Sequence, residues 1–147
     1  MGGSNDMAMA TWVSGGIMIV VLSGPPTDDE WSRWVEVNRK LRDQKLRVIV
    51  ESHGSRSAPD ATQRKTLAEV LQGTDVRVAV LTDSLLTRGI VTALAWLGVP
   101  QKAFDFGLHR QAGAYLELTS SELEQILAEL PRLRRTCGLD ALHTAAG

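Results

Sequence analysis

The stretch Val76–Gly98, VRVAVLTDSLLTRGIVTALAWLG, decides the fold that the sequence predicts. Its opening VRVAVL is apolar except for Arg77, and such a run is typical of a strand buried on both faces. Asp83 or Ser84 then stops the strand and offers an N-cap oxygen to a helix. That helix, over 85–97, is apolar nearly all round. We therefore expect a sheet to cover one side of it, and another helix or a partner chain to cover the other side.

Strands and helices alternate on both sides of this unit. Two short β-prone runs, 10–14 and 17–23, flank Gly15-Gly16 and predict a hairpin at the start of the chain. Hydrophobic periodicity and capping signals predict the other elements. They are helices at 28–42, 60–71, 108–118 and 121–133, and strands at 46–50 and 103–106. Pro131 should kink or end the last helix.

This order of elements predicts the fold class. Strands that alternate with helices are parallel neighbours joined by right-handed crossovers. We predict an α/β fold with a mixed, largely parallel sheet of about five strands, an N-terminal β-hairpin and helices on the sheet faces. The single domain is expected at 11–137, after a disordered or tag-derived N-terminus at 1–10 and before a flexible C-terminal tail at 138–147.

Composition argues against several classes of protein. The formal net charge of −1 argues against a nucleic-acid binder, which would normally carry an excess of Lys and Arg. No apolar run approaches the roughly 18 residues of a transmembrane helix, and the N-terminus lacks the basic and apolar segments of a signal peptide. A lone cysteine, Cys137, excludes an internal disulfide and favours the cytoplasm. We therefore expect a cytoplasmic protein without a transmembrane segment.

The residues that could carry chemistry form no established catalytic or metal-binding motif. His53, His109, His143 and Cys137 are scattered, without the spacing of metal ligands. Neither a GxGxxG motif nor a P-loop occurs, so nucleotide binding has no motif behind it. Ser52 beside His53 suggests a hydrolase, but the GxSxG elbow is missing. We expect no enzyme, no metal and no cofactor.

A hairpin followed by repeated helix–strand units resembles the STAS domains. These include the anti-sigma factor antagonists and the SpoIIAA-like group, which is distantly similar to lipid-carrying SEC14 domains. The similarity covers roughly Thr11 to Leu118 and is greatest in APDATQRKTLAEVL, residues 58–71, and in Val76–Gly98. The resemblance implies a bacterial signalling domain that regulates by binding another protein.

The resemblance also points to one loop. In the antagonists, a partner kinase phosphorylates a Ser or Thr in an Asp-Ser-Gly type motif after the strand before the second helix, and this switches binding. The corresponding stretch here, 51–55, reads Glu-Ser-His-Gly-Ser and follows a strand, where α/β proteins place their ligands. A phosphate there would meet the dipole of the next helix and the nearby Arg56. The candidate phosphorylation or partner-binding residues are Ser52, Ser55 and Ser57; alternatively, these are ordinary loop and capping residues.

A wider partner surface surrounds this loop. The end of the central strand should lie beside the 52–57 loop if the two strands are neighbours. The candidate surface consists of Arg56, Arg64, Lys65, Thr82, Asp83, Ser84 and Arg88. The same corner admits a receiver-like signalling domain as a third hypothesis, although no strand-end Asp fits the phosphoacceptor.

We thus predict a non-enzymatic regulatory protein–protein interaction module of STAS-like type, which uses the loop at 52–57 and adjacent helices to bind an unidentified protein. Self-association through the apolar third or fifth helix is a further prediction, because these helices carry more apolar surface than one sheet face covers. The alternative from another class is a carrier or sensor of a small apolar molecule or lipid, similar to SEC14. Such a carrier requires an apolar pocket between the third helix and the sheet.

Overall fold

The computed structural model describes residues 8–54, 59–96 and 98–139, with Arg42 described by its backbone alone. The chain forms one five-stranded sheet in the order β1-β2-β3-β4-β5. The strands are β1 (Met9–Ser14), β2 (Ile17–Leu22), β3 (Arg47–Ser52), β4 (Arg77–Leu81) and β5 (Gln101–Phe104). The helices are α1 (Asp28–Leu41), α2 (Ala61–Leu71), α3 (Leu85–Trp96), α4 (His109–Tyr115) and α5 (Ser120–Thr136), and the short 3-10 helix η2 (Arg42–Gln44) follows α1.

The sheet is mixed, as the sequence predicts. β1 pairs with β2 in antiparallel fashion through a turn at Gly15, whose φ of 59° suits glycine. The pairs β2–β3, β3–β4 and β4–β5 are all parallel. The predicted α/β class, with an N-terminal hairpin and a largely parallel remainder, is therefore confirmed.

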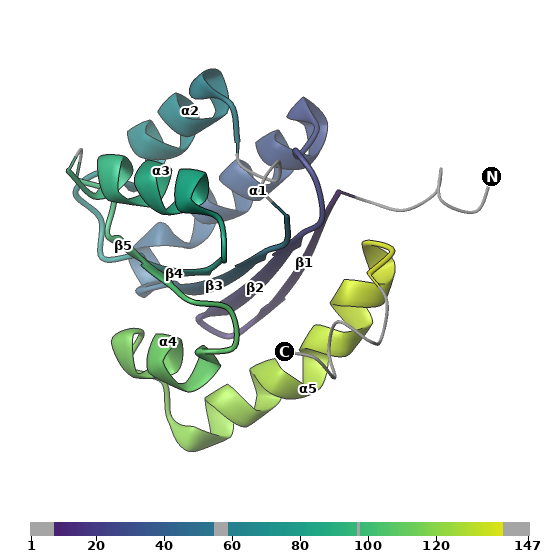
Figure 1. Cartoon of the computed structure of the whole chain (residues 1–147). Coiled ribbons are helices and arrows are strands. Elements are labelled where there is room, and N and C mark those ends of the chain that lie inside the picture. The colour runs from purple at the N-terminus through teal and green to yellow at the C-terminus, as the bar shows by residue number, and fades with distance from the viewer. Residues whose placement is uncertain (1–7, 55–58, 97, 140–147) are drawn as a thin grey trace.

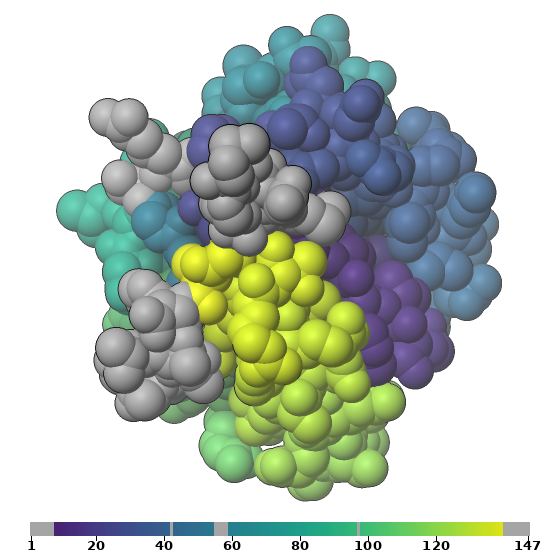
Figure 2. Space-filling view, turned by 90° about the vertical axis from the view of Figure 1, so that its right-hand side faces the viewer, coloured from purple at the N-terminus to yellow at the C-terminus, as the bar shows by residue number. Residues whose placement is uncertain are grey.

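Helices cover both faces of the sheet (Figure 1). Strand order follows chain order, so successive right-handed crossovers place α1, α2 and α3 on the same face. After β5 the chain passes to the opposite face, which α4 and α5 cover. There α5 lies beside β1, and Figure 2 shows the two elements in contact.

Two apolar cores result from the alternation of side chains along the strands. On β3, Val48 and Val50 belong to the core under α1–α3, whereas Ile49 belongs to the core under α4 and α5. Trp31 and Trp34 of α1 contribute to the first core. The apolar stripe of α5 is buried, and its last three members belong to the second core: Leu123, Ile126, Leu130 and Leu133.

Pro131 was predicted to kink or end the last helix. It does not end the helix, because α5 continues to Thr136. A proline inside a helix removes one backbone hydrogen bond and clashes with the preceding turn. Beyond the proline, Leu133 and Cys137 are nevertheless buried in the second core, and the Cys137 thiol donates to the carbonyl of Val21 at 3.5 Å. Packing on both sides of Pro131 thus keeps the helix continuous.

Some predicted boundaries were also wrong. β3 ends at Ser52 and not at residue 50, with Glu51 paired to Val21 and Leu81 of the neighbouring strands. β5 begins at Gln101, whose buried amide donates to the carbonyl of Val91 at 3.3 Å and so makes a polar strand position acceptable. The fourth helix spans only 109–115. These differences arise from tertiary partners that local patterns do not reveal.

Candidate functional site

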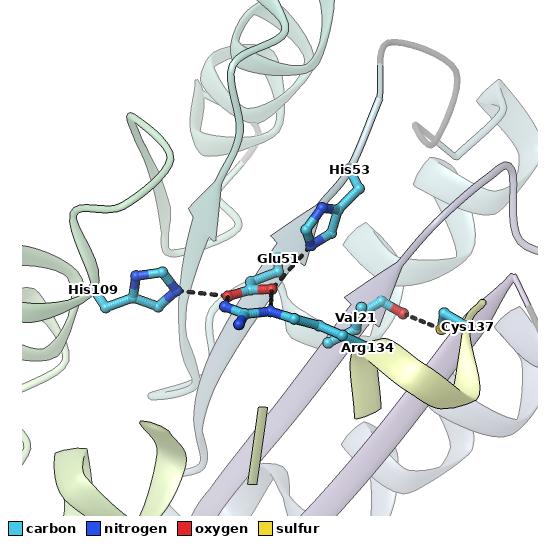
Figure 3. Close-up of polar contacts among 6 residues, drawn as sticks. All are labelled: Val21, Glu51, His53, His109, Arg134 and Cys137. Atoms are coloured by element: carbon cyan, nitrogen blue, oxygen red, sulfur yellow. Dashed lines mark hydrogen bonds and ion pairs between the residues drawn. The ribbon is translucent and has the colours of Figure 1, made fainter. Parts of the chain in front are cut away.

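Two features of the structure are distinct from the packed cores: a buried polar cluster at the carboxyl end of β3, and an exposed apolar surface on α3 with a groove between α3 and α2. The cluster centres on Glu51, which is 1% exposed (Figure 3). We call Glu51, His53, His109 and Arg134 the Glu51 cluster.

The carboxylate of Glu51 accepts four hydrogen bonds, two on each oxygen. Nε2 of His53 lies 2.9 Å from Oε1, and Nε2 of His109 lies 2.6 Å from Oε2. Arg134 donates Nε to Oε1 at 2.9 Å and Nη2 to Oε2 at 2.5 Å. Because an ionised carboxylate can only accept, each imidazole must present an N–H at Nε2. Both oxygens of Glu51 are therefore saturated.

Different elements supply these side chains. His53 follows Glu51 by two residues, so the two share a face of the extended chain, and its ring meets that of Phe106 edge-on at 4.5 Å. His109 is the first residue of α4, and Arg134 lies in the last turn of α5. The Glu51 cluster thus ties β3 to both helices that cover this face of the sheet.

The electrostatics favour an ionised Glu51. Burial on its own raises the pKa of the carboxyl, but hydrogen bonds from Arg134, His109 and His53 and the charge of Arg134 outweigh burial and hold the pKa well below its usual range. A carboxylate with such a low pKa and no spare lone pair is a poor general base. This geometry suits a clamp between elements better than proton transfer to or from a substrate.

Ser52 does not join this cluster. It points to the opposite face of β3, where it is 2% exposed and lines the core under α1–α3. Ser52 therefore does not lie on the face that carries Glu51 and His53, so the hydrolase constellation of Ser52 with His53 is not formed. The prediction that Glu51 and Ser52 lie in a loop is wrong, because both belong to β3.

The other candidate residues of the loop, Ser55, Arg56 and Ser57, lie outside the described residues. Within the described part of the chain, no group of three or more His, Cys, Asp and Glu side chains is arranged to hold a metal ion. In the same described part, no helix is long and apolar enough to cross a membrane.

The residues that follow β4 shape a turn and cap α3. Thr82 is fully buried, and its hydroxyl accepts from the Ser84 amide at 3.1 Å. Ser84 in turn accepts from the Thr87 amide at 3.2 Å, which confirms it as the helix cap. Asp83 accepts from the Phe106 amide at 3.2 Å. Of the predicted partner residues in this corner, Asp83 is exposed and Thr82 is not.

Arg88, Arg64 and Lys65 lie on the outer helices. Arg88 pairs with Asp105 beyond β5. Arg64 donates to the carbonyl of Pro59 at 2.9 Å, and Lys65 is exposed. Arg64 and Lys65 belong to the second feature, a surface groove between α2 and α3.

This groove has a volume of about 570 Å³. Four exposed large hydrophobic side chains occur among the described residues, and three of them belong to α3: Leu85 (84% exposed), Leu86 (62%) and Trp96 (85%). The outer side of α3 is therefore apolar and uncovered, which is unusual for a lone domain. The groove is lined by Ala61, Arg64, Lys65, Ala68, Glu69, Gln72, Leu85, Leu86, Gly89, Ile90, Ala93 and Leu94.

A small internal cavity lies between the sheet and α1–α3. Its volume is about 50 Å³, and its lining is mostly apolar but includes Ser52, Thr87 and Gln101. The hydroxyl oxygen of Thr87 is buried without a hydrogen-bond partner. Pockets for small molecules typically hold about 300–1,000 Å³. The cavity lies where a carried lipid would have to sit, but it is far smaller than such a ligand.

Sequence reasoning found the apolar α3 and missed the Glu51 cluster. The available signal was an acid that continues an apolar strand run, followed two residues later by a histidine on the same face. Its partners His109 and Arg134 are 58 and 83 residues away, and no local pattern connects them. No model of a known protein family matches this chain, and no curated protein is significantly similar to it in sequence.

Proposed function

We propose that this protein is a non-enzymatic regulatory interaction module of STAS-like type, which binds a helix of a partner protein in the groove between α2 and α3. One observation carries the proposal: the exposed Leu85 and Leu86 line that groove, and Trp96 of the same helix is exposed as well. Burial of large apolar side chains is the main driving force of association, and monomeric proteins rarely leave such a group uncovered.

The shape of the groove favours a helix as the bound element. α2 and α3 each connect the end of one parallel strand to the start of the next, so the two helices run in the same direction. Between two such helices a third helix can lay its apolar face, with anchors repeated every three or four residues. Arg64, Lys65 and Glu69 at the rim would provide polar contacts around an apolar centre.

The regulatory part of the proposal concerns the segment before α2. Asp60 caps α2 and forms a capping box with Gln63, so this helix end already holds one carboxylate. A phosphate on Ser55 or Ser57 would place more negative charge a few residues from the groove. Ser55→Glu and Ser57→Glu should each change the affinity for the partner. Equal affinity in both variants and the wild type would contradict a phosphorylation switch.

The interaction surface can be tested by affinity purification of the tagged full chain from its source cells, with quantitative mass spectrometry. We expect Leu86→Ala with Trp96→Ala to lose the specific partner. Val13→Ala is the matched control, because Val13 is the fourth exposed large hydrophobic residue and lies on β1, away from the groove. Retention of every partner by the double variant would contradict the proposal.

The carrier function remains the alternative, because an apolar cavity lies between α3 and the sheet. With about 50 Å³ available, a carried lipid would require α3 to move away from the sheet. Native mass spectrometry of protein from its source cells distinguishes the two functions. An added lipid mass would favour the carrier, and a mass of protein alone would favour the interaction module.

A further inference from the structure

The exposed side of α3 has the pattern of a helix-pairing seam. Leu86, Gly89, Ala93 and Trp96 are separated by three, four and three residues, which is the spacing of successive seam positions in helices that pack side by side. All four are exposed. Leu85 lies beside this seam and is also exposed, so one continuous apolar strip runs the length of the helix.

The seam is complementary to itself when a second copy runs antiparallel. Leu86 then faces Trp96 of the second copy, and Gly89 faces Ala93 of the second copy. Both pairings are centred on position 91, so one two-fold axis at the middle of α3 satisfies them together. Large side chains meet at both ends, and small residues meet in the middle, where the helices come closest.

Gly89 is the independent observation that supports close pairing. It lies in the middle of α3, where glycine is a poor helix former. A Cβ built at this position would meet no atom within 4 Å, and the φ angle of Gly89 is not positive. Nothing within the described chain therefore requires glycine here. A second helix that approaches the backbone closely would require it.

Charge is compatible with this arrangement. α3 carries one charged residue, Arg88, and Asp105 of the same chain pairs with it. No charge would be buried along the seam. When the two α2–α3 layers face each other, α2 comes toward α2 of the second copy, and its exposed Lys65 and Glu69 offer one charge of each sign. The rim would then unite opposite charges.

We infer that the helix that covers the outer side of α3, beside the α2–α3 groove, is α3 of a second copy of this chain, so that two molecules form a symmetric dimer in which the two α2–α3 layers face each other. This inference rests on the proposed function, because it names the partner of the same surface. The sequence predicts self-association through the third or the fifth helix. The apolar stripe of α5 is buried within the chain, so α3 is the helix that we assign to self-association.

The test is sedimentation analysis of the full chain over a range of concentrations. The wild type should form dimers, and Trp96→Ala should weaken dimerisation by at least about tenfold, because each dimer loses the large aromatic contact at both ends of the seam. Val13→Ala should leave the dimer unchanged. Gly89→Leu is the decisive variant: it adds apolar surface and suits a helix, but it blocks close approach, so it should also weaken the dimer by at least about tenfold.

Unspecific association of an apolar patch would instead be strengthened by Gly89→Leu, and that result would overturn the inference. A wild type that stays monomeric throughout would overturn it as well. If the wild type is monomeric, the affinity purification separates the two claims. Loss of a different partner protein in the Leu86→Ala, Trp96→Ala double variant would still support the proposed function. Retention of every partner by that variant would contradict the proposed function as well as the dimer. Circular dichroism of each variant shows that the fold is retained.

Discussion

At the scale of single residues, Glu51 is a buried charged side chain whose two carboxylate oxygens each accept two hydrogen bonds. Its carboxylate is buried and accepts from Arg134, His53 and His109. A buried charge is tolerated only when its partners are complete, and removal of one partner leaves an uncompensated charge. The Glu51 cluster should therefore be sensitive to truncation of any member.

Arg134→Ala should lower the free energy of unfolding by about 3 kcal/mol, near the low end of values for broken buried ion pairs, because both histidines still donate to Glu51. Arg132→Ala is the control, since Arg132 pairs with Glu129 at an exposed position on the same helix. That change should cost less than about 1 kcal/mol. Urea unfolding measures both values; equal effects would contradict a buried clamp.

Acid should weaken the fold through the same residue. The folded state holds the pKa of Glu51 well below its ordinary value of 4.5, so the contribution of Glu51 to stability is complete above that value and declines as the pH falls below it. The unfolding free energy of the wild type should therefore fall more steeply from about pH 5 to about pH 3 than that of Glu51→Gln. Parallel pH profiles for the two proteins, measured by urea unfolding, would contradict a depressed pKa.

The residue scale is also where sequence reasoning was least successful. The strand at 46–50 was recognised from its apolar run, but Glu51 and Ser52 looked like loop residues because both are polar. Each is buried for a different reason: Glu51 meets distant partners on one face of β3, and Ser52 lines the cavity on the other face. The contacts that allow these two polar side chains to be buried come from residues far apart in the chain, so a local pattern cannot reveal them.

At the scale of elements, most helices and strands could be predicted because their apolar periodicities agree with their capping residues. Thr119 and Asp60 begin their helices with complete capping boxes. The outer side of α3 is the informative exception. The same apolar pattern that predicts a covered helix belongs to a helix whose outer side the described residues leave exposed. The apolar pattern of α3 predicts that the helix is covered, but it does not identify the element that covers it.

Two glycines in helices provide a matched comparison. Gly89→Ala should raise the free energy of unfolding by up to about 1 kcal/mol at concentrations where the chain is monomeric, since the new methyl group meets open space. Gly113→Ala should raise it less or lower it, because its Cβ would come within 3.3 Å of Leu123. Thermal unfolding of both variants measures the difference. A destabilising Gly89→Ala in the monomer would show that the isolated fold itself needs this glycine.

At the scale of the whole molecule, the sheet order follows chain order, and this places α1–α3 on one face and α4 and α5 on the other. The face under α4 and α5 is closed by the buried stripe of α5 and by the Glu51 cluster. The opposite face ends in an open groove and three exposed large side chains. The two faces thus differ. The chain itself closes the face under α4 and α5, and we propose that a partner helix covers the outer side of α3.

Site-specific photo-crosslinking from α3 in source cells tests that central claim most directly. A photoreactive residue at Thr92, exposed beside the seam, should form a specific adduct with another protein, and the adduct should have twice the chain mass if the partner is a second copy. The same probe at Gln125, exposed on α5, should form none. Equal or absent crosslinking from both positions would contradict the claim that the α2–α3 surface binds a partner.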